Sequence, residues 1–143
     1  MQKLALAFLC TLLAGIARAE QSVTVGPWEV HYSALSTAGL DPTVARNYGI
    51  TRSRNRVMLN VAVFRNDERG RISSTAGIEA AASNLNGQRR TMGMRRVEEG
   101  EAIYYLGFTR VADRETLSFT LSVTPEGADR PIEIRFEQQF FAN

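Results

Sequence analysis

The chain has 143 residues, of which 44% are hydrophobic and 22% are charged, and its formal net charge is +2. This composition is typical of a globular domain and excludes an intrinsically disordered chain. Both Lys3 and Arg18 lie in residues 1–19, and beyond that segment 15 arginines balance 15 acidic side chains. The balance excludes a polycation built for nucleic acid, because electrostatic binding of phosphates needs surplus positive charge.

The N-terminal segment has the pattern of a cleaved export signal. Lys3 supplies a positive n-region, Leu4–Ile16 forms a short apolar run, and Ala17-Arg18-Ala19 gives a small-x-small cleavage site before Glu20. The apolar run is too short to cross about 30 Å of hydrocarbon comfortably. We therefore expect a periplasmic protein with no membrane anchor after signal cleavage, made of a single domain over residues 20–143.

Cysteine is absent from the expected mature chain, because Cys10 lies in the export signal. The mature protein then has no disulfide, no thiolate nucleophile and no cysteine metal site. Core packing alone must stabilise it, and a chain of this size buries roughly two-thirds of its unfolded surface.

Alternation of hydrophobic and polar residues predicts strands along most of the mature chain. The alternating segments cover residues 28–33, 57–63, 117–123 and 132–137, and residues 102–111 form a β-rich run. Short turns separate them, and Asn86-Gly87 predicts a hairpin with a type I′ turn, in which both central residues have positive φ. The pattern predicts an all-β protein, an immunoglobulin-like β-sandwich of about seven strands.

Two segments depart from this alternation. Residues 41–49 predict a short helical insert, because Asp41 can cap a helix, Pro42 fits its first position and Gly49 can end it. Residues 78–85 fit both a helical stripe and a strand. The alternation that leads into them from Ile72 favours the strand.

Several short motifs occur in an order that resembles a known family. They are Glu29-Val30-His31-Tyr32-Ser33-Ala34-Leu35, Leu40-Asp41-Pro42, Tyr48-Gly49-Ile50-Thr51-Arg52-Ser53, Asn84-Leu85-Asn86-Gly87-Gln88, Glu101-Ala102-Ile103-Tyr104-Tyr105 and Phe136-Glu137-Gln138-Gln139-Phe140-Phe141. Over nearly the whole mature chain, the sequence is similar to small exported bacterial proteins of the domain of unknown function 4426 family. The resemblance implies a secreted or periplasmic single domain, and it implies no particular reaction, cofactor or catalytic residue.

Arginines supply the first candidate site. Arg52, Arg54 and Arg56 have strand spacing and would line one face, together with Asn60 and close to Tyr48. A cleft there would bind a carboxylate or phosphate through bidentate hydrogen bonds. We therefore predict a ligand site at Tyr48, Arg52, Arg54 and Asn60. The expected partner is a small anionic ligand, or a periplasmic protein that pairs with a sheet edge, and not nucleic acid. The alternative is a charged face that is only solvated.

The histidine and the methionines raise two further hypotheses. The first is a catalytic triad of His31, Ser33 and an Asp, since His31 and Ser33 share a strand face. Residues two apart on a strand lie roughly 6–7 Å apart, however, which is long for a hydrogen bond between a base and its nucleophile. Met92 and Met94 suggest a Cu(I) site, with Met58 and His31 as helpers, because thioethers select Cu(I), although methionine is also a common core residue. We predict a non-catalytic binding or accessory module without a cofactor. An enzyme with an unrecognised acid–base site and a periplasmic copper carrier are the alternatives.

Overall fold

A computed structural model of the chain describes residues 20–142, so the predicted export signal lies outside the described residues. Ten strands run through this part of the chain, and two short helical elements follow the second strand. The elements are β1 (Gln21–Val25), β2 (Trp28–Ser36), the 3-10 turn η1 (Thr37–Gly39), α2 (Pro42–Asn47), β3 (Arg56–Asp67), β4 (Gly70–Ser73), β5 (Ala76–Ser83), β6 (Arg89–Met92), β7 (Arg95–Glu99), β8 (Ala102–Arg110), β9 (Thr116–Pro125) and β10 (Ile132–Gln139).

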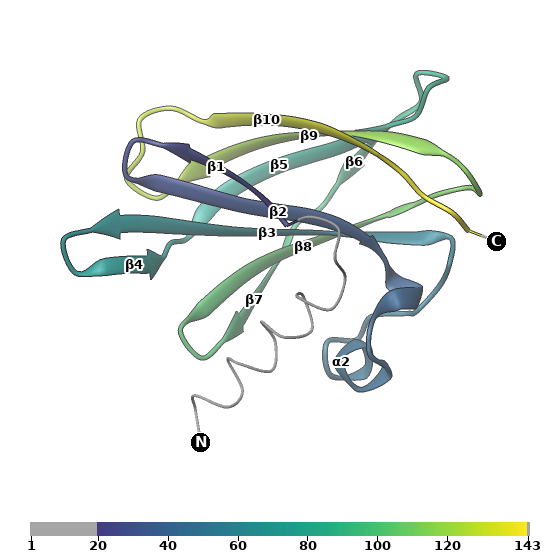
Figure 1. The fold of residues 1–143 in the computed structure, drawn as a ribbon, viewed down its shortest axis with the longest axis horizontal. Helices are drawn as coiled ribbons and strands as arrows, with labels where there is room; N and C mark the ends of the chain where they lie inside the picture. Colours follow the sequence, from purple (N-terminus) through teal and green to yellow (C-terminus); the bar gives the residue numbers. More distant parts are fainter. Residues whose placement is uncertain (1–19, 143) are drawn as a thin grey trace.

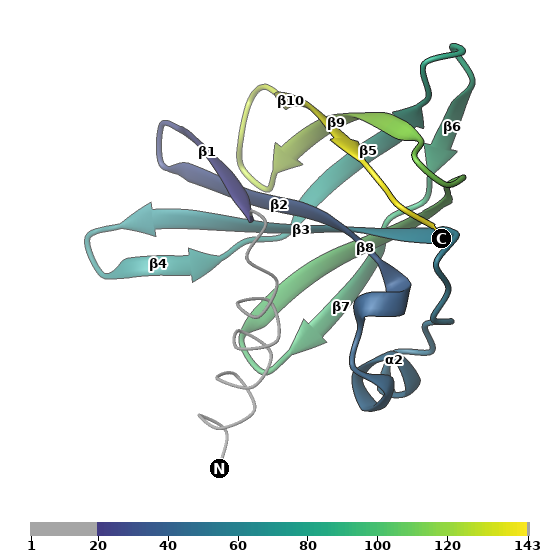
Figure 2. The same cartoon turned by 45° about the vertical axis from the view of Figure 1, so that its right-hand side comes forward.

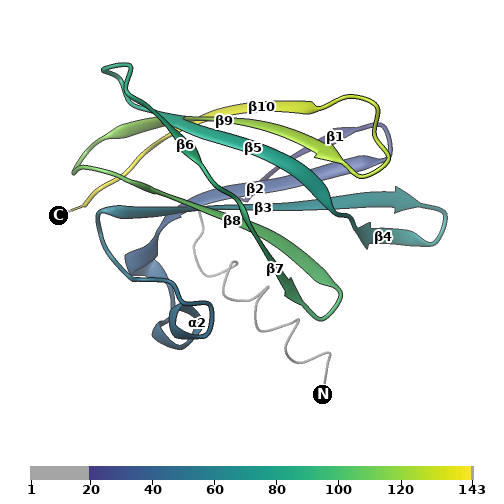
Figure 3. The ribbon, with the colours of Figure 1, turned by 180° about the vertical axis from the view of Figure 1, so that it is seen from behind.

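The strands form two antiparallel sheets that stack face to face (Figure 1, Figure 2). Sheet A has six strands in the order β1-β2-β3-β8-β7, with β4 paired to β3, and sheet B has four in the order β10-β9-β5-β6. Between β6 and β7 the chain passes from sheet B to sheet A, which Figure 3 shows from behind. The predicted all-β sandwich is confirmed, with ten strands among residues 20–142 in place of about seven.

Alternate residues of both sheets fill the space between them. The ring of Tyr32 from sheet A lies 4.9 Å from the ring of Phe136 from sheet B. Burying each large apolar side chain contributes about 1.5–3 kcal/mol, so this core stabilises the fold without a covalent link. The most deeply buried side chains are Val30, Val57, Leu59, Val61 and Val63 of sheet A and Phe119, Leu121 and Val123 of sheet B.

A second, smaller apolar cluster lies on the outer face of sheet A. There α2 covers one end of the sheet (Figure 1) and packs Ala45 against Met58 and Leu106. The predicted helical insert is confirmed, with Asp41 as its cap and Pro42 in its first turn. Within residues 20–142, no helix is long and apolar enough to span a membrane.

Strand pairing settles two local predictions. The segment that fits either helix or strand lies in β5, because its backbone pairs with β6 on one side and β9 on the other, which outweighs the helix preference of alanine. The Asn86-Gly87 hairpin forms, but the type I′ turn is wrong, because Gly87 has positive φ (+80°) and Asn86 does not. The amide of Gly87 bonds to the carbonyl of Asn84, and the amide of Asn84 bonds to the carbonyl of Gln88. The result is a three-residue loop that ends in a left-handed glycine.

Candidate functional site

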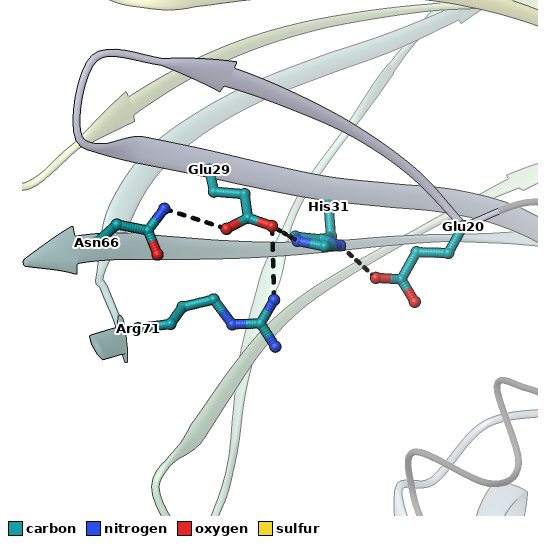
Figure 4. Close-up of polar contacts among 5 residues, drawn as sticks. All are labelled: Glu20, Glu29, His31, Asn66 and Arg71. Atoms are coloured by element: carbon teal, nitrogen blue, oxygen red, sulfur yellow. Dashed lines mark hydrogen bonds and ion pairs between the residues drawn. The ribbon is translucent and has the colours of Figure 1, made fainter.

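Polar residues on the outer face of sheet A gather around His31 (Figure 4). Nδ1 of His31 lies 2.5 Å from Oε1 of Glu20, and Nε2 lies 2.6 Å from Oε1 of Glu29. Asn66 donates a hydrogen bond of 3.2 Å to Oε2 of Glu29, and Arg71 donates one of 3.5 Å to Oε1. Two glutamates therefore hold the imidazole from opposite sides.

Strand geometry explains why these residues meet. Glu29 and His31 are two apart on β2, so their side chains share a face. The β3–β4 hairpin pairs Arg71 with Asn66 and folds the arginine over the same face. Because β1 pairs with β2, Glu20, which immediately precedes β1, reaches His31 from the other direction.

The ring of Phe64 lies beneath the charged groups. His31 meets it edge-on, with ring centroids 5.3 Å apart, and the guanidinium of Arg71 lies 4.3 Å above its centre. Such a cation over an aromatic face gains about 0.5–1 kcal/mol at an exposed site. The pKa of the Glu29 carboxyl lies below its usual value, mainly because of the hydrogen bond from Asn66 and to a smaller extent because of the one from His31. Glu29, His31 and Arg71 are therefore each held by more than one contact.

A hollow of about 180 Å³ opens beside the cluster. Polar side chains of His31, Ser33 and Asn60 line it together with the apolar surface of Ala62 and Phe64. Oδ1 of Asn60 is buried and has no hydrogen-bond partner within residues 20–142. An unpaired buried acceptor costs about 1–3 kcal/mol, so a ligand that donates a hydrogen bond to this atom would remove that cost.

The four residues predicted to bind a ligand do not line one common pocket among the described pockets. Asn60 lines the hollow. Tyr48 lies at the C-terminal end of α2, where its hydroxyl donates a hydrogen bond to Glu99. The pKa of Tyr48 is raised to about 12, mainly because the phenol is partly buried and also because the carboxylate of Glu99 lies next to it. Arg52 and Arg54 belong to neither the hollow nor this hydrogen bond.

The predicted arginine stripe is wrong in its geometry. β3 begins at Arg56, so Arg52 and Arg54 lie in the loop before it, where Arg54 is exposed and Arg52 donates to a carbonyl of η1 at 2.9 Å. The buried hydroxyl of Thr37 gives the physical reason. It bonds to the carbonyl and the amide of Ser53 at 3.1 and 2.8 Å, and so holds this segment against η1 in place of a strand ladder.

The residues considered for copper lie on opposite faces of sheet A. Met92 and Met94 pack in the core between the sheets, whereas His31 and Met58 lie on the outer face. No group of three His, Cys, Asp or Glu side chains among residues 20–142 is placed to hold a metal ion. Both ring nitrogens of His31 already contact carboxylates, so neither is free to act as a base toward Ser33.

Several residues of this site were not predicted from the sequence: Glu20, Glu29, Phe64 and Arg71. The spacing of Glu29 and His31 is a signal that the sequence carries, because residues two apart on a strand share a face. No spacing connects Glu20 or Arg71 to them, since those contacts depend on which strands pair and in which register.

Comparisons with known proteins agree with this fold. The family model of the domain of unknown function DUF4426 matches residues 22–143. A DUF4426 family protein from Pseudomonas aeruginosa, solved by crystallography, is 30% identical and superposes with a TM-score of 0.73, covering 87% of this chain and 96% of that one. No curated protein matches the chain.

Two structures of FetP from uropathogenic Escherichia coli are also similar. A copper-bound variant is 13% identical with a TM-score of 0.60, covering 87% of this chain and 97% of that one. The as-isolated protein is 13% identical with a TM-score of 0.58, covering 87% and 95%. At this identity the likeness concerns the fold alone. The family model and the relative from Pseudomonas carry the assignment, and the chain therefore belongs to the DUF4426 family of domains of unknown function.

Proposed function

We propose that the protein is an exported, periplasmic and non-catalytic binding module, and that it holds its ligand in the hollow beside His31. The observation that carries this proposal is Oδ1 of Asn60, a buried acceptor without a partner among the described residues. A buried polar group without a partner lowers stability, and such a group needs an explanation other than stability, of which ligand binding is one. The hollow rests on paired strands of sheet A, which hold its walls in place.

The lining groups indicate the chemistry of the ligand. Glu20 and Arg71 carry opposite charges, so the hollow does not favour a strongly charged ligand. Oδ1 of Asn60 would accept a hydrogen bond from a donor on the ligand, and the surfaces of Ala62 and Phe64 suit a short apolar group. These features fit an uncharged ligand with an amide N–H or a hydroxyl beside a small apolar part. The hollow has space for a group the size of roughly six water molecules, so a larger ligand would insert only one of its ends.

Export is the second part of the proposal, and it rests on the sequence pattern of residues 1–19. Fractionation of cells followed by mass spectrometry of the intact protein tests it directly. We expect the periplasmic fraction to contain a chain that begins at Glu20. A full-length chain in the cytoplasmic fraction would contradict this part of the proposal without affecting the binding site.

Calorimetric titration with N-acetylglucosamine and with N-methylacetamide tests the binding site, because both probes are small, uncharged and carry an amide donor beside an apolar part. We expect at least one probe to bind the wild-type protein and to lose at least about tenfold in affinity with Asn60→Leu, since one buried hydrogen bond is worth about a factor of ten. Arg54→Ala, whose side chain is exposed outside the hollow, is the matched control and should bind as the wild type does.

The same variant separates a binding role from a structural one. Asn60→Leu removes the unpaired acceptor and keeps the branched shape of the side chain, so the free energy of unfolding should rise by about 1 kcal/mol in urea denaturation. Higher stability together with lost binding is the expected combination. Binding that is unchanged by the substitution, or the absence of binding with both probes, would refute the proposed site.

A further inference from the structure

A second recess on the outer face of sheet A carries an independent inference. It is a groove of about 460 Å³ at the end of the sheet where β3 begins and β8 ends. Arg56 and Arg110 line it together with Phe108 and the polar side chains of Ser53 and Asn55. Arg56 precedes Asn60 by four residues along β3, which is roughly 13 Å, so the groove is separate from the hollow.

The two arginines are direct cross-strand partners. Arg56 of β3 lies opposite Arg110 of β8 in the register of the antiparallel pair, so both side chains leave the sheet on the same face. Like charges in this position repel each other and destabilise the sheet. No acidic residue lines the groove, and neither arginine forms an ion pair within residues 20–142.

Other charged residues near the end of β8 do not neutralise the positive charge of the two arginines. Asp113 and Glu115, the acids that follow β8, accept hydrogen bonds from the backbone amides of Ala142 and Ala112, and neither acid lines the groove. Arg90 donates to the carbonyl of Arg110 at 3.3 Å and so brings a third guanidinium to the same end of β8. Among the described residues, the groove wall therefore contains two guanidinium groups, those of Arg56 and Arg110, and no carboxylate.

The side chain of Arg56 is held in place, and one of its donors is unused. Its guanidinium carbon lies 4.6 Å from the centre of the Phe108 ring. Stacking on an aromatic face leaves the edge of the guanidinium plane available for bidentate hydrogen bonds. Nε of Arg56 is buried without an acceptor in the described part of the chain. A donor in that state costs about 1–3 kcal/mol, and an oxyanion that reached it would supply the missing acceptor.

We propose that the groove between Arg56 and Arg110 is a binding site for the oxyanion of a small ligand, a carboxylate or a phosphate. Both groups present two oxygen atoms that match the edge of a guanidinium. The bound anion would neutralise the cross-strand repulsion and pair with the unused donor of Arg56. This site does not depend on the proposed function of the hollow.

Titration of the wild-type protein with inorganic phosphate and with citrate, each against sodium chloride at matched ionic strength, tests this inference. Calorimetry gives the affinity, and the ¹⁵N–¹H signal of the Arg56 side-chain Nε–H reports contact with the anion. We expect at least one anion to bind and to shift this signal. Binding of phosphate alone would assign a phosphoryl ligand, and binding of citrate as well would assign a general oxyanion site. Binding of neither would overturn the proposal.

Variants distinguish a shaped site from a general ionic effect. Arg56→Gln and Arg110→Gln should each lower the affinity at least about tenfold, because each removes charge-assisted hydrogen bonds. Arg56→Lys keeps the charge but loses the planar fork, and should also lose affinity. Arg135→Gln, an exposed site on β10 in the other sheet, is the control and should leave binding unchanged. Equal affinity of all four variants and the wild type would overturn the proposal.

The melting temperature without phosphate or citrate supplies a further readout. Arg110→Gln removes one of two facing like charges, so its melting temperature in sodium chloride should equal or exceed that of the wild type. A lower melting temperature combined with unchanged anion binding would show that the arginine pair serves the fold, and would overturn the proposal.

Discussion

Tyr48 donates its phenolic hydrogen bond to Glu99, a residue 51 positions away in the sequence. The contact ties the C-terminal end of α2 to the end of β7 and closes the apolar cluster on the outer face of sheet A. Arg95, also on β7, donates to the backbone carbonyl of Tyr48 at 2.8 Å. Tyr48 therefore connects the helical insert to the sheet through both its side chain and its backbone.

Substitution of Tyr48 by phenylalanine tests the strength of this connection. The change removes a hydrogen bond to a charged group, so we expect the free energy of unfolding to fall by about 1.5–3 kcal/mol in urea denaturation at neutral pH. Because the folded pKa of about 12 lies above the ordinary value of 10.0, this contribution is fully present below pH 10.0 and is lost as the pH rises toward 12. The stabilities of the variant and the wild type should therefore approach each other in strong alkali.

Ultraviolet titration of the tyrosinates provides the direct check. The wild-type protein should show a tyrosine ionisation step near pH 12, and Tyr48→Phe should lack that step. A wild-type chain in which all tyrosines ionise together near pH 10.0 would show that the phenol is neither buried nor paired in solution.

The hydrogen bonds to Glu29 predict a specific acid sensitivity. Its folded pKa lies below the ordinary value of 4.5, so its contribution is present above pH 4.5 and is lost as the pH falls through the folded pKa. Glu29→Gln should therefore reduce the loss of stability in that acidic range. Urea midpoints measured across this range give the comparison. Glu68→Gln, in the exposed turn between β3 and β4, is the control and should retain the wild-type pH dependence.

The strands were largely predictable, whereas their assignment to sheets was not. The alternation from Leu117 to Val123 predicts β9 because one of its faces is buried and the other is wet. The alternation at Ile72, Ser74, Ala76 and Ile78 runs on without interruption. Yet the chain leaves sheet A after β4 and enters sheet B at β5 within that stretch. The side-chain period is the same in both sheets, so it does not mark the crossing.

The candidate site was predictable only where it depends on one strand. Asn60 lies on the outer face of sheet A, opposite the face of its core neighbours Leu59 and Val61, as strand spacing predicts. Arg52 and Arg54 continue the same spacing, but the hydroxyl of Thr37 removes their segment from the sheet, and that contact joins residues 16 positions apart. Contacts of this kind are set by tertiary structure, and a single sequence carries no local signal for them.

Stacked aromatic rings of sheet B predict a large effect at Phe119. Its side chain is fully buried, with its ring stacked 4.9 Å from Phe136 and edge-on to Phe140 at 6.2 Å. Phe119→Ala should lower the free energy of unfolding by about 3–5 kcal/mol, because it leaves a cavity in a core without a covalent link. Leu85→Ala removes a side chain that is 82% exposed and should change stability by less than about 0.5 kcal/mol. Similar losses in the two variants would contradict the assigned core.

The close approach of the β6–β7 crossing to β8 predicts that Gly107 tolerates no side chain without cost. A Cβ at this position would lie 2.5 Å from Sδ of Met94 and 3.4 Å from Cε of Met92. Gly107→Ala should therefore lower the free energy of unfolding by about 1–3 kcal/mol through overpacking. Shortening Met94 should relieve the clash, because its sulfur atom is the nearest obstacle.

A double-mutant cycle of Gly107→Ala and Met94→Ala measures this relief. Each single variant loses stability for a different reason, the first through crowding and the second through lost packing of a partly buried side chain. In the double variant the new methyl group occupies space that the methionine has vacated, so the total loss should be smaller than the sum by about 0.5–3 kcal/mol. Losses that simply add would mean that Met94 does not lie against Gly107. Packing of the Met92-Gly93-Met94 segment against β8 would then not depend on the sulfur atom of Met94.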